Sequence, residues 1–283
     1  MKFQEKNILL NYTEPGKALI TGASAGLGLC FANKLAEYGV DLVLIARREE
    51  RLQEIATRLE SEHSIQCEII PADLALDEDI EKVADRIKQI SDLDILINNA
   101  GFATLGNFAD VPVEKDMRMI HVHIKASVQF TYAALQIMRK RKQGIIINVS
   151  SIGAYILTPG NALYDATKSF LNTFSENLSL ELKGLGIKIQ ALCPGFMSTE
   201  FHESGDLKNF DKSVVPDSSW MKPESVVLQS LKALEKNKKT IFIPGRKKRF
   251  AKWLYVNSSL VRYLFQKKLE NLEQNSKAGN TKV

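Results

Sequence analysis

The sequence predicts an α/β protein with a doubly wound parallel sheet of about seven strands and helices on both faces. Short apolar runs of strand composition alternate with longer helix-like stretches along most of the 283 residues. No Ser-, Gly- or Pro-rich linker divides the chain, which indicates a single domain. Because side chains that follow parallel strands meet at one sheet edge, we expect the functional site at the carboxyl ends of the strands.

The composition favours an ordinary globular protein, with 45% hydrophobic and 25% charged residues. Three cysteines lie far apart without paired spacing, so we expect neither a metal site nor a disulfide framework, and a reducing cytoplasm is the expected location. The first residues show no signal-peptide pattern, and we expect no membrane-spanning helix.

The first strand and helix flank a glycine-rich turn. Lys17–Ile20 is a β-like run, TGASAGLG occupies 21–28, and residues 29–38 have helical composition. Gly22, Gly26 and Gly28 allow a tight turn and a close approach to a pyrophosphate at the helix N-terminus. The pattern predicts a dinucleotide site, although a plain glycine turn between strand and helix is the alternative.

The second strand, 41–46, ends in Arg47 where an NAD-selecting fold places an acid. A guanidinium there suits a 2′-phosphate, so the sequence favours NADP(H) over NAD(H). The alternative is that Arg47 begins a solvated helix, as we expect of Arg48. Further on, we expect a helix over 49–62, a strand over 66–70, and a helix over 77–90, which Asp77 is placed to cap.

The central part of the chain supplies two further strands and a long helix. Asp94–Asn99 is the expected fourth strand, running into the loop of NNAG at 98–101. A helical stretch covers about 112–142, and the apolar run 144–149 is the fifth strand.

Residues 151–168 offer a hydroxyl, a phenol and an ammonium. Tyr164 and Lys168 stand at i and i+4 of an expected helix over 163–182, so they share one face, and a nearby cation lowers the pKa of a phenol. Tyr263 and Lys267 repeat this spacing, so the pair alone is weak evidence. Ser151 lies thirteen residues before Tyr164, whereas Phe250 holds that place before Tyr263 and can donate nothing.

The last third contains the sixth strand, 187–193, and then a long segment, 196–222, whose apolar and polar composition suits a substrate lid. A helix over 223–237 and a seventh strand over 240–245 complete the domain. Residues 246–268 carry +8 within a chain of net +5, so the basicity belongs to this segment. If 247–269 is one amphipathic helix, it either lies on an anionic membrane surface or docks on its own domain or a partner subunit. One basic helix does not indicate nucleic-acid binding.

Together, TGASAGLG, NNAG and the Ser151, Tyr164 and Lys168 triad resemble the classical short-chain dehydrogenase/reductase family over residues 16–245. The resemblance implies a Rossmann-type catalytic domain, 16–245, preceded by an extension, 1–15, and followed by a basic segment, 246–273, and a tail, 274–283. It implies a homodimer or homotetramer, and it assigns a cofactor-binding set: Gly22, Ser24, Gly26, Leu27, Gly28, Arg47, Asp73, Leu74, Asn99, Tyr164, Lys168 and Thr199. For Asp73 the alternative is a helix cap.

The sequence departs from that family at His123, where the usual residue is an asparagine that helps to hold a water beside the catalytic lysine. Histidine titrates near neutrality and can take over this relay, or it can pack against a neighbour; both remain open.

The expected activity is reduction of a lipophilic ketone or 3-oxoacyl group by NADP(H), with Tyr164 as general acid, Lys168 beside it and Ser151 at the carbonyl oxygen. Oxidation of a secondary alcohol uses the same residues in reverse. A catalytically silent, dinucleotide-binding scaffold is the alternative from a different class of protein.

Overall fold

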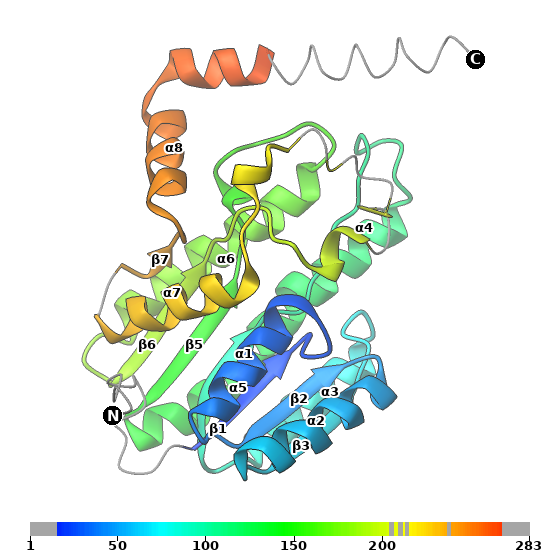
Figure 1. Cartoon of the computed structure of the whole chain (residues 1–283), viewed down its shortest axis with the longest axis vertical. Coiled ribbons are helices and arrows are strands. Elements are labelled where there is room, and N and C mark those ends of the chain that lie inside the picture. The colour runs from blue at the N-terminus through cyan, green and yellow to red at the C-terminus, as the bar shows by residue number, and fades with distance from the viewer. Residues whose placement is uncertain (1–15, 204–206, 209–211, 213–214, 237–238, 268–283) are drawn as a thin grey trace.

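The computed structural model describes residues 16–203, 207–208, 212, 215–236 and 239–267. The expected N-terminal extension, 1–15, and the tail, 274–283, lie outside the described residues, as does Phe210 of the lid. The described part forms one sheet with helices on both faces (Figure 1), which confirms the predicted fold class.

Seven parallel strands form the sheet in the order β3-β2-β1-β4-β5-β6-β7. Their bounds, in chain order, are β1 Lys17–Thr21, β2 Leu42–Ala46, β3 Cys67–Pro71, β4 Leu93–Asn98, β5 Gly144–Val149, β6 Ile187–Leu192 and β7 Ile241–Phe242. The strand order reverses between β1 and β4, and the crevice beyond this point is where open α/β sheets bind ligands.

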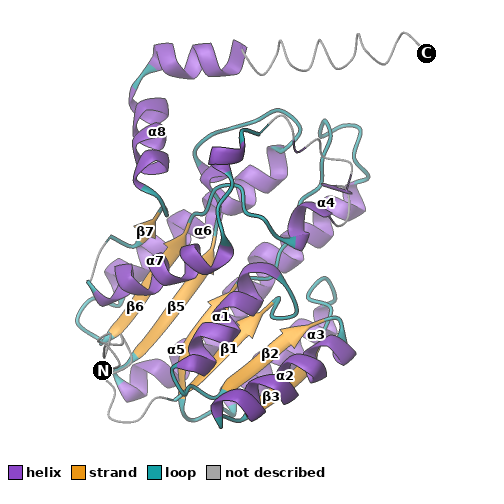
Figure 2. Ribbon diagram, in the orientation of Figure 1, coloured by secondary structure: helices purple, strands orange, loops and turns teal. Residues whose placement is uncertain are grey.

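Two layers of helices cover the sheet (Figure 2). One face carries α1 Gly26–Glu37, α2 Glu49–His63 and α7 Pro223–Glu235, and the other carries α3 Asp77–Lys88, α5 Ala126–Arg141 and α6 Ala162–Glu181. Two apolar cores result, one on each side of the strands. The near-continuous apolar runs of the central strands are explained by burial on both faces.

The expected long helix over 112–142 is divided by a π-helical turn. Helix α4 spans Val113–Ile120, the π turn spans His121–Lys125, and α5 follows directly at Ala126. Such turns occur within α-helices, often at functional sites. Here the turn contains His123, whose side chain is buried.

The basic segment, which we call the C-terminal arm and define as residues 246–267, is not one helix as expected. Helix α8 spans Arg246–Asn257, Ser258 is extended, and residues 259–267 form a second helix. The Ser258 hydroxyl accepts a hydrogen bond from the Val261 N–H at 3.3 Å, so it caps the second helix and turns the chain there.

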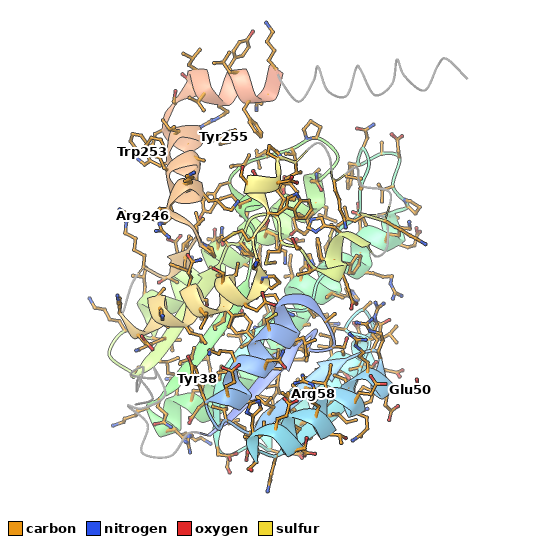
Figure 3. The ribbon with its side chains drawn as sticks, in the orientation of Figure 1. Tyr38, Glu50, Arg58, Arg246, Trp253 and Tyr255 are labelled. Carbon is orange, nitrogen blue, oxygen red and sulfur yellow. The ribbon has the colours of Figure 1, made fainter. Side chains whose placement is uncertain are left out.

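The arm stands away from the sheet (Figure 1). Figure 3 shows Trp253 and Tyr255 on different sides of α8. Trp253 is 57% exposed, whereas Tyr255 is buried and packs edge-on against Phe265 of the second helix. The inner side of the arm is therefore packed and the outer side is free.

Candidate functional site

Ser151, Tyr164 and Lys168 meet beyond the carboxyl end of β5. Ser151 lies two residues after the end of the strand, and the other two lie in the first two turns of α6. The Lys168 ammonium donates to the Val149 carbonyl at 3.0 Å and lies 5.6 Å from the centroid of the Tyr164 ring. The Ser151 hydroxyl lies near enough to the Tyr164 phenol to act on its pKa. The structure thus brings the three predicted groups together.

Burial dominates the electrostatics of this cluster. It raises the pKa of Tyr164 to about 12, against the hydrogen bond with Ser151, which lowers it. Burial also lowers the pKa of Lys168 to about 7, so the amine is only partly protonated at neutral pH. The expected lowering of the Tyr164 pKa is wrong for this structure, because desolvation of the phenolate is the largest effect on that pKa.

His123 lies beside this cluster with both ring nitrogens in use. The Phe102 N–H donates to Nε2 at 3.2 Å, and Nδ1 lies 2.9 Å from the Thr167 hydroxyl oxygen. Since that hydroxyl donates to the Tyr164 carbonyl at 2.8 Å, Nδ1 must carry the proton and donate to Thr167. The imidazole is therefore a neutral ring with a defined tautomer.

The pKa of His123 points the same way. Burial and the nearby charge of Lys168 hold it well below its usual range. The expectation that His123 titrates near neutrality is therefore wrong, and its contacts match the packing alternative. A methyl group on Gly101 would lie 2.7 Å from Nε2, so the glycine of NNAG leaves the room that the larger ring needs.

The glycine turn has the geometry of a phosphate cradle. Gly22 and Gly26 have φ of +67° and +53°, which side-chain-bearing residues rarely adopt. A Cβ on Gly28 would lie 2.4 Å from the Gly22 carbonyl, so only glycine lets α1 pack this closely against the turn. No side chain caps the start of α1 and no acid lies in its first turn. Its free N–H groups fit the pyrophosphate of a dinucleotide.

Other predicted cofactor residues surround this turn. The Asn99 amide donates to the Thr21 carbonyl at 2.8 Å and to the Gly22 carbonyl at 3.3 Å, which fixes the turn to the end of β4. The side chains of Leu27 and Leu74 are buried in the two apolar cores, so a contact with a cofactor would come from their backbone.

Arg48, which we expected to be solvated, contacts the glycine turn. Its guanidinium donates to the Ser24 hydroxyl at 3.1 Å and to the Ser24 carbonyl at 3.3 Å. It also forms an ion pair with Glu200 at 3.2 Å. Arg47 is exposed and has no hydrogen bond or ion pair to any residue that the structure describes.

The two adjacent arginines differ in their place in the structure. Arg47 directly follows β2, whereas Arg48 is the residue before α2, from which its side chain reaches back to Ser24. The Arg48 guanidinium therefore lies beside the glycine turn, near the place where a 2′-phosphate is expected, and Arg47 is its neighbour in sequence. Their donors suit a phosphate in the same way.

Asp73 holds a turn between β3 and α3. Its carboxylate accepts from the Ala75 N–H at 3.1 Å and pairs with Arg118 at 2.9 Å. The sequence suggested that Asp77 caps α3, with Asp73 as a second candidate. Neither side chain caps the helix, because Leu76 holds the N-cap position. The Asp77 carboxylate pairs instead with Lys125 at 2.7 Å.

Thr199 lies at the base of the lid and over the glycine turn. A Cβ on Gly26 would lie 3.3 Å from the Thr199 Cβ, so the two segments are in close contact. Met197 and Met221 form a parallel bridge that brings the two ends of the lid together. Phe201 then places its ring 6.4 Å from that of Tyr164.

Aromatic rings gather on the lid near Phe201. Phe196 and Trp220 pack against each other and against His202, with centroid distances of 5.1 to 5.8 Å. Among the described residues no group of three or more metal-ligating side chains is placed to hold an ion. None of the helices described is both long and apolar enough to cross a membrane.

Comparison with known proteins adds to this geometry. The family model for short chain dehydrogenases matches residues 16–208. An uncharacterized oxidoreductase of Staphylococcus epidermidis is 34% identical over 193 residues, which are 67% of this chain and 81% of that protein. One from Staphylococcus aureus is 31% identical over 205 residues, or 71% and 87% of the two chains.

Solved structures match over a larger share of the chain. A short-chain dehydrogenase from Sphingobium yanoikuyae in complex with NADPH has a TM-score of 0.76 at 28% identity, covering 95% of this chain and 96% of that one. A 7β-hydroxysteroid dehydrogenase gives 0.79 at 25% identity, covering 91% and 98%. A bulky-bulky ketone specific alcohol dehydrogenase from Comamonas testosteroni gives 0.72 at 25% identity, covering 95% of each chain.

Proposed function

Because the chain belongs to the short-chain dehydrogenase family and is a nicotinamide-dependent oxidoreductase, we propose that it reduces a lipophilic ketone or 3-oxoacyl group with NADP(H). The observation that carries this proposal is the meeting of Ser151, Tyr164 and Lys168 beside the glycine turn. When bound, the cofactor supplies the hydride, and the protein supplies position, a proton and hydrogen bonds.

Tyr164 is the proton donor to the carbonyl oxygen. Its raised pKa keeps the phenol protonated at neutral pH, which is the form that a general acid needs. Ser151 donates its hydroxyl proton to the same oxygen as negative charge develops there. By family resemblance, Lys168 binds the nicotinamide ribose. When Lys168 is protonated, its positive charge beside the phenol ring favours loss of the Tyr164 proton during the reaction.

Selection of NADP(H) rests on two arginines rather than one. Arg47 is free to grip a 2′-phosphate, and Arg48 lies on Ser24 at the same edge of the glycine turn. Glu200 holds Arg48 through a half-exposed ion pair, which a phosphate can displace at small cost. The NADPH bound in the Sphingobium yanoikuyae structure supports this choice.

The substrate class follows from the lid. Phe201 faces the Tyr164 ring, and Phe196 and Trp220 lie on the same segment, so an apolar ketone would be covered by aromatic side chains. Two of the similar solved proteins are described as specific for bulky-bulky ketones and as a hydroxysteroid dehydrogenase. Both descriptions fit a bulky apolar carbonyl compound.

The decisive experiment is NADPH consumption by the purified protein with a panel of ketones graded in size and polarity. We expect turnover that increases with apolar bulk, and slower reduction with NADH. Oxidation of the corresponding alcohols with NADP+ tests the reverse direction. Tight NADPH binding without turnover on any compound would support the silent scaffold instead.

A homodimer through α5 and α6 accounts for the exposed apolar side chains on these helices. Tyr132 is 65% exposed on α5 and Leu180 is 73% exposed on α6, where Phe170 also stacks on Phe174. An interface between two copies would take these apolar side chains out of water. Light scattering should give the mass of a dimer or tetramer, and Leu180→Lys should lower it.

The arm is proposed to rest on an anionic membrane surface of the cytoplasm. It carries Phe250, Trp253, Leu260, Tyr263 and Leu264, each more than half exposed, so these side chains do not dock on their own domain. The whole segment 246–268 has no acidic residue. Because two such arms repel each other, an anionic lipid fits the arm better than a second arm.

Sedimentation with vesicles tests the arm. Trp253→Ser should weaken binding to vesicles that contain phosphatidylserine, and vesicles of phosphatidylcholine alone should bind little. Leu76→Ser is the matched control, because Leu76 is a half-exposed leucine at the N-cap of α3, outside the arm. This variant should bind the vesicles like wild type. Equal sedimentation of wild type and Trp253→Ser would exclude this contact.

A further inference from the structure

Asp165 follows the catalytic tyrosine on α6, and its side chain is only 5% exposed. One carboxylate oxygen, Oδ2, accepts the Thr158 N–H at 3.3 Å. The other, Oδ1, lies against Gly153, where an added Cβ would come within 2.5 Å of it. Thr158 and Gly153 both belong to residues 151–161, which we call the serine loop because Ser151 begins it.

The serine loop also connects Asp165 to Ser151. The Gly153 N–H donates to the Ser151 hydroxyl oxygen at 3.0 Å, and a Cβ added to Gly153 would lie close to both that oxygen and the Asp165 carboxylate. A second side chain of α6, Ser169, donates to the Ala154 carbonyl at 3.1 Å. The loop that carries one reacting hydroxyl is thus held by the helix that carries the other.

We propose that Asp165 is a positioning residue, which fastens the serine loop to α6 and so keeps the hydroxyls of Ser151 and Tyr164 in register. This inference rests on the proposed function, since register between the two hydroxyls matters only if both act on one carbonyl oxygen. In such a reaction a shift of about 1 Å can cost about a hundred-fold in rate.

A carboxylate at this place has an effect that a neutral side chain would lack. Asp165 has no ion pair among the described residues, and burial raises its pKa to about 7. Its negative charge in turn raises the pKa of Tyr164. When ionised, Asp165 therefore helps to keep the neighbouring phenol protonated, which is the form needed for reduction.

The fastening is tested without any turnover by amide hydrogen exchange at Thr158. Asp165→Ala removes the acceptor, so exchange there should accelerate about ten-fold, while Asp165→Asn keeps an acceptor oxygen and should stay near wild type. Asp116→Ala is the matched control, because that buried carboxylate accepts from the Thr104 hydroxyl at 2.8 Å and should leave Thr158 unchanged.

Turnover then tests positioning. In Asp165→Ala the kcat should fall about ten-fold or more, while the Kd for NADPH stays unchanged, because Asp165 does not touch the glycine turn. Asp165→Asn should recover most of the kcat, and Asp116→Ala should keep it. Asp165→Leu, similar in shape and without an acceptor, repeats both measurements if the alanine variant does not fold.

Two results would overturn the proposal: unchanged exchange at Thr158 in both the alanine and leucine variants, or faster exchange with unaltered kcat. Failure of the proposed function would look different. In that case wild type would turn over no carbonyl compound, while the exchange measurement would still decide whether Asp165 holds the loop.

Discussion

The chain contains two Tyr-x-x-x-Lys pairs, one in the sheet domain and one in the arm, and their local geometry is nearly the same. The lysine nitrogen lies 5.6 Å from the ring centroid in Tyr164 and Lys168, and 6.0 Å in Tyr263 and Lys267. Their surroundings differ. Lys168 is 4% exposed and bonded to the Val149 carbonyl, whereas Tyr263 is 57% exposed.

The comparison shows that helical spacing places a cation over a ring but does not make a catalytic pair. What separates the two is the neighbourhood that burial creates. Around Tyr164 the sheet supplies a hydroxyl from Ser151 and a carbonyl for the lysine, and desolvation shifts both pKa values. A sequence pattern that ignores burial gives both pairs equal weight.

The largest expected effect separates the two tyrosines. Tyr164→Phe keeps the ring and removes the hydroxyl, so it should lower kcat by at least about a hundred-fold while NADPH still binds. Tyr263→Phe, the same change in the arm, should leave kcat unaltered. Ketone reduction at saturating NADPH measures both, and near wild-type turnover by Tyr164→Phe would remove the tyrosine from the mechanism.

The second effect concerns two adjacent arginines with different contacts. Loss of a charge-assisted hydrogen bond costs about 1.5 to 3 kcal/mol, so Arg47→Ala and Arg48→Ala should each weaken NADPH binding by about ten- to a hundred-fold. NADH affinity should change little in Arg47→Ala. Fluorescence titration with both cofactors makes the measurement.

Arg48→Ala has a further outcome, because it also frees Ser24 in the glycine turn. It should weaken NADH as well, though by less. If each variant weakened the binding of NADPH and of NADH by the same factor, these arginines would not bind the 2′-phosphate.

The third effect tests whether His123 has only a packing role beside the catalytic cluster. His123→Leu leaves the Phe102 N–H without an acceptor, which should lower the free energy of unfolding by about 1 to 3 kcal/mol in a urea titration. The pH profile of kcat should have the same shape in wild type and His123→Asn. A limb near neutrality in the wild-type profile alone would instead indicate that His123 takes part in a proton relay.

The smallest effect concerns the pH dependence of stability. Burial raises the pKa of Asp165 from 3.8 to about 7, so the protonated form is favoured on folding. This contribution to stability is present below pH 4 and is lost as pH rises towards 7. Asp165→Asn should remove it, so the difference in unfolding midpoint between pH 5 and pH 8 should shrink by a few degrees. An unchanged difference would contradict the raised pKa.

Much of the fold was predictable because it rests on local patterns. The strand over 144–149 matches β5 at both ends, and the helix expected over 163–182 is α6 within one residue. The arm was predicted as one helix because its apolar spacing is continuous through Ser258. A serine followed by a helical run is an N-cap signal, and it was the evidence available against a single helix.

The candidate site was less predictable because its chemistry depends on burial and on contacts between distant segments. The trio of Ser151, Tyr164 and Lys168 follows from spacing, but the directions of the Tyr164 and His123 pKa shifts do not. The contact of Arg48 with Ser24 joins residues from two different turns. No local pattern reveals it, since Arg47 and Arg48 have the same chemistry.

The π turn at residues 121–125 sets the rotational phase of the long helix in which it lies. One extra residue in a turn advances the later side chains by about 100° relative to a regular helix. Asp116 and Met119 before the turn, and Ala126 and Phe130 after it, are all buried, so both halves of the helix pack against the rest of the protein. Deleting a single residue here would rotate one half of the helix off its core, so this position tolerates substitution far better than a change in length.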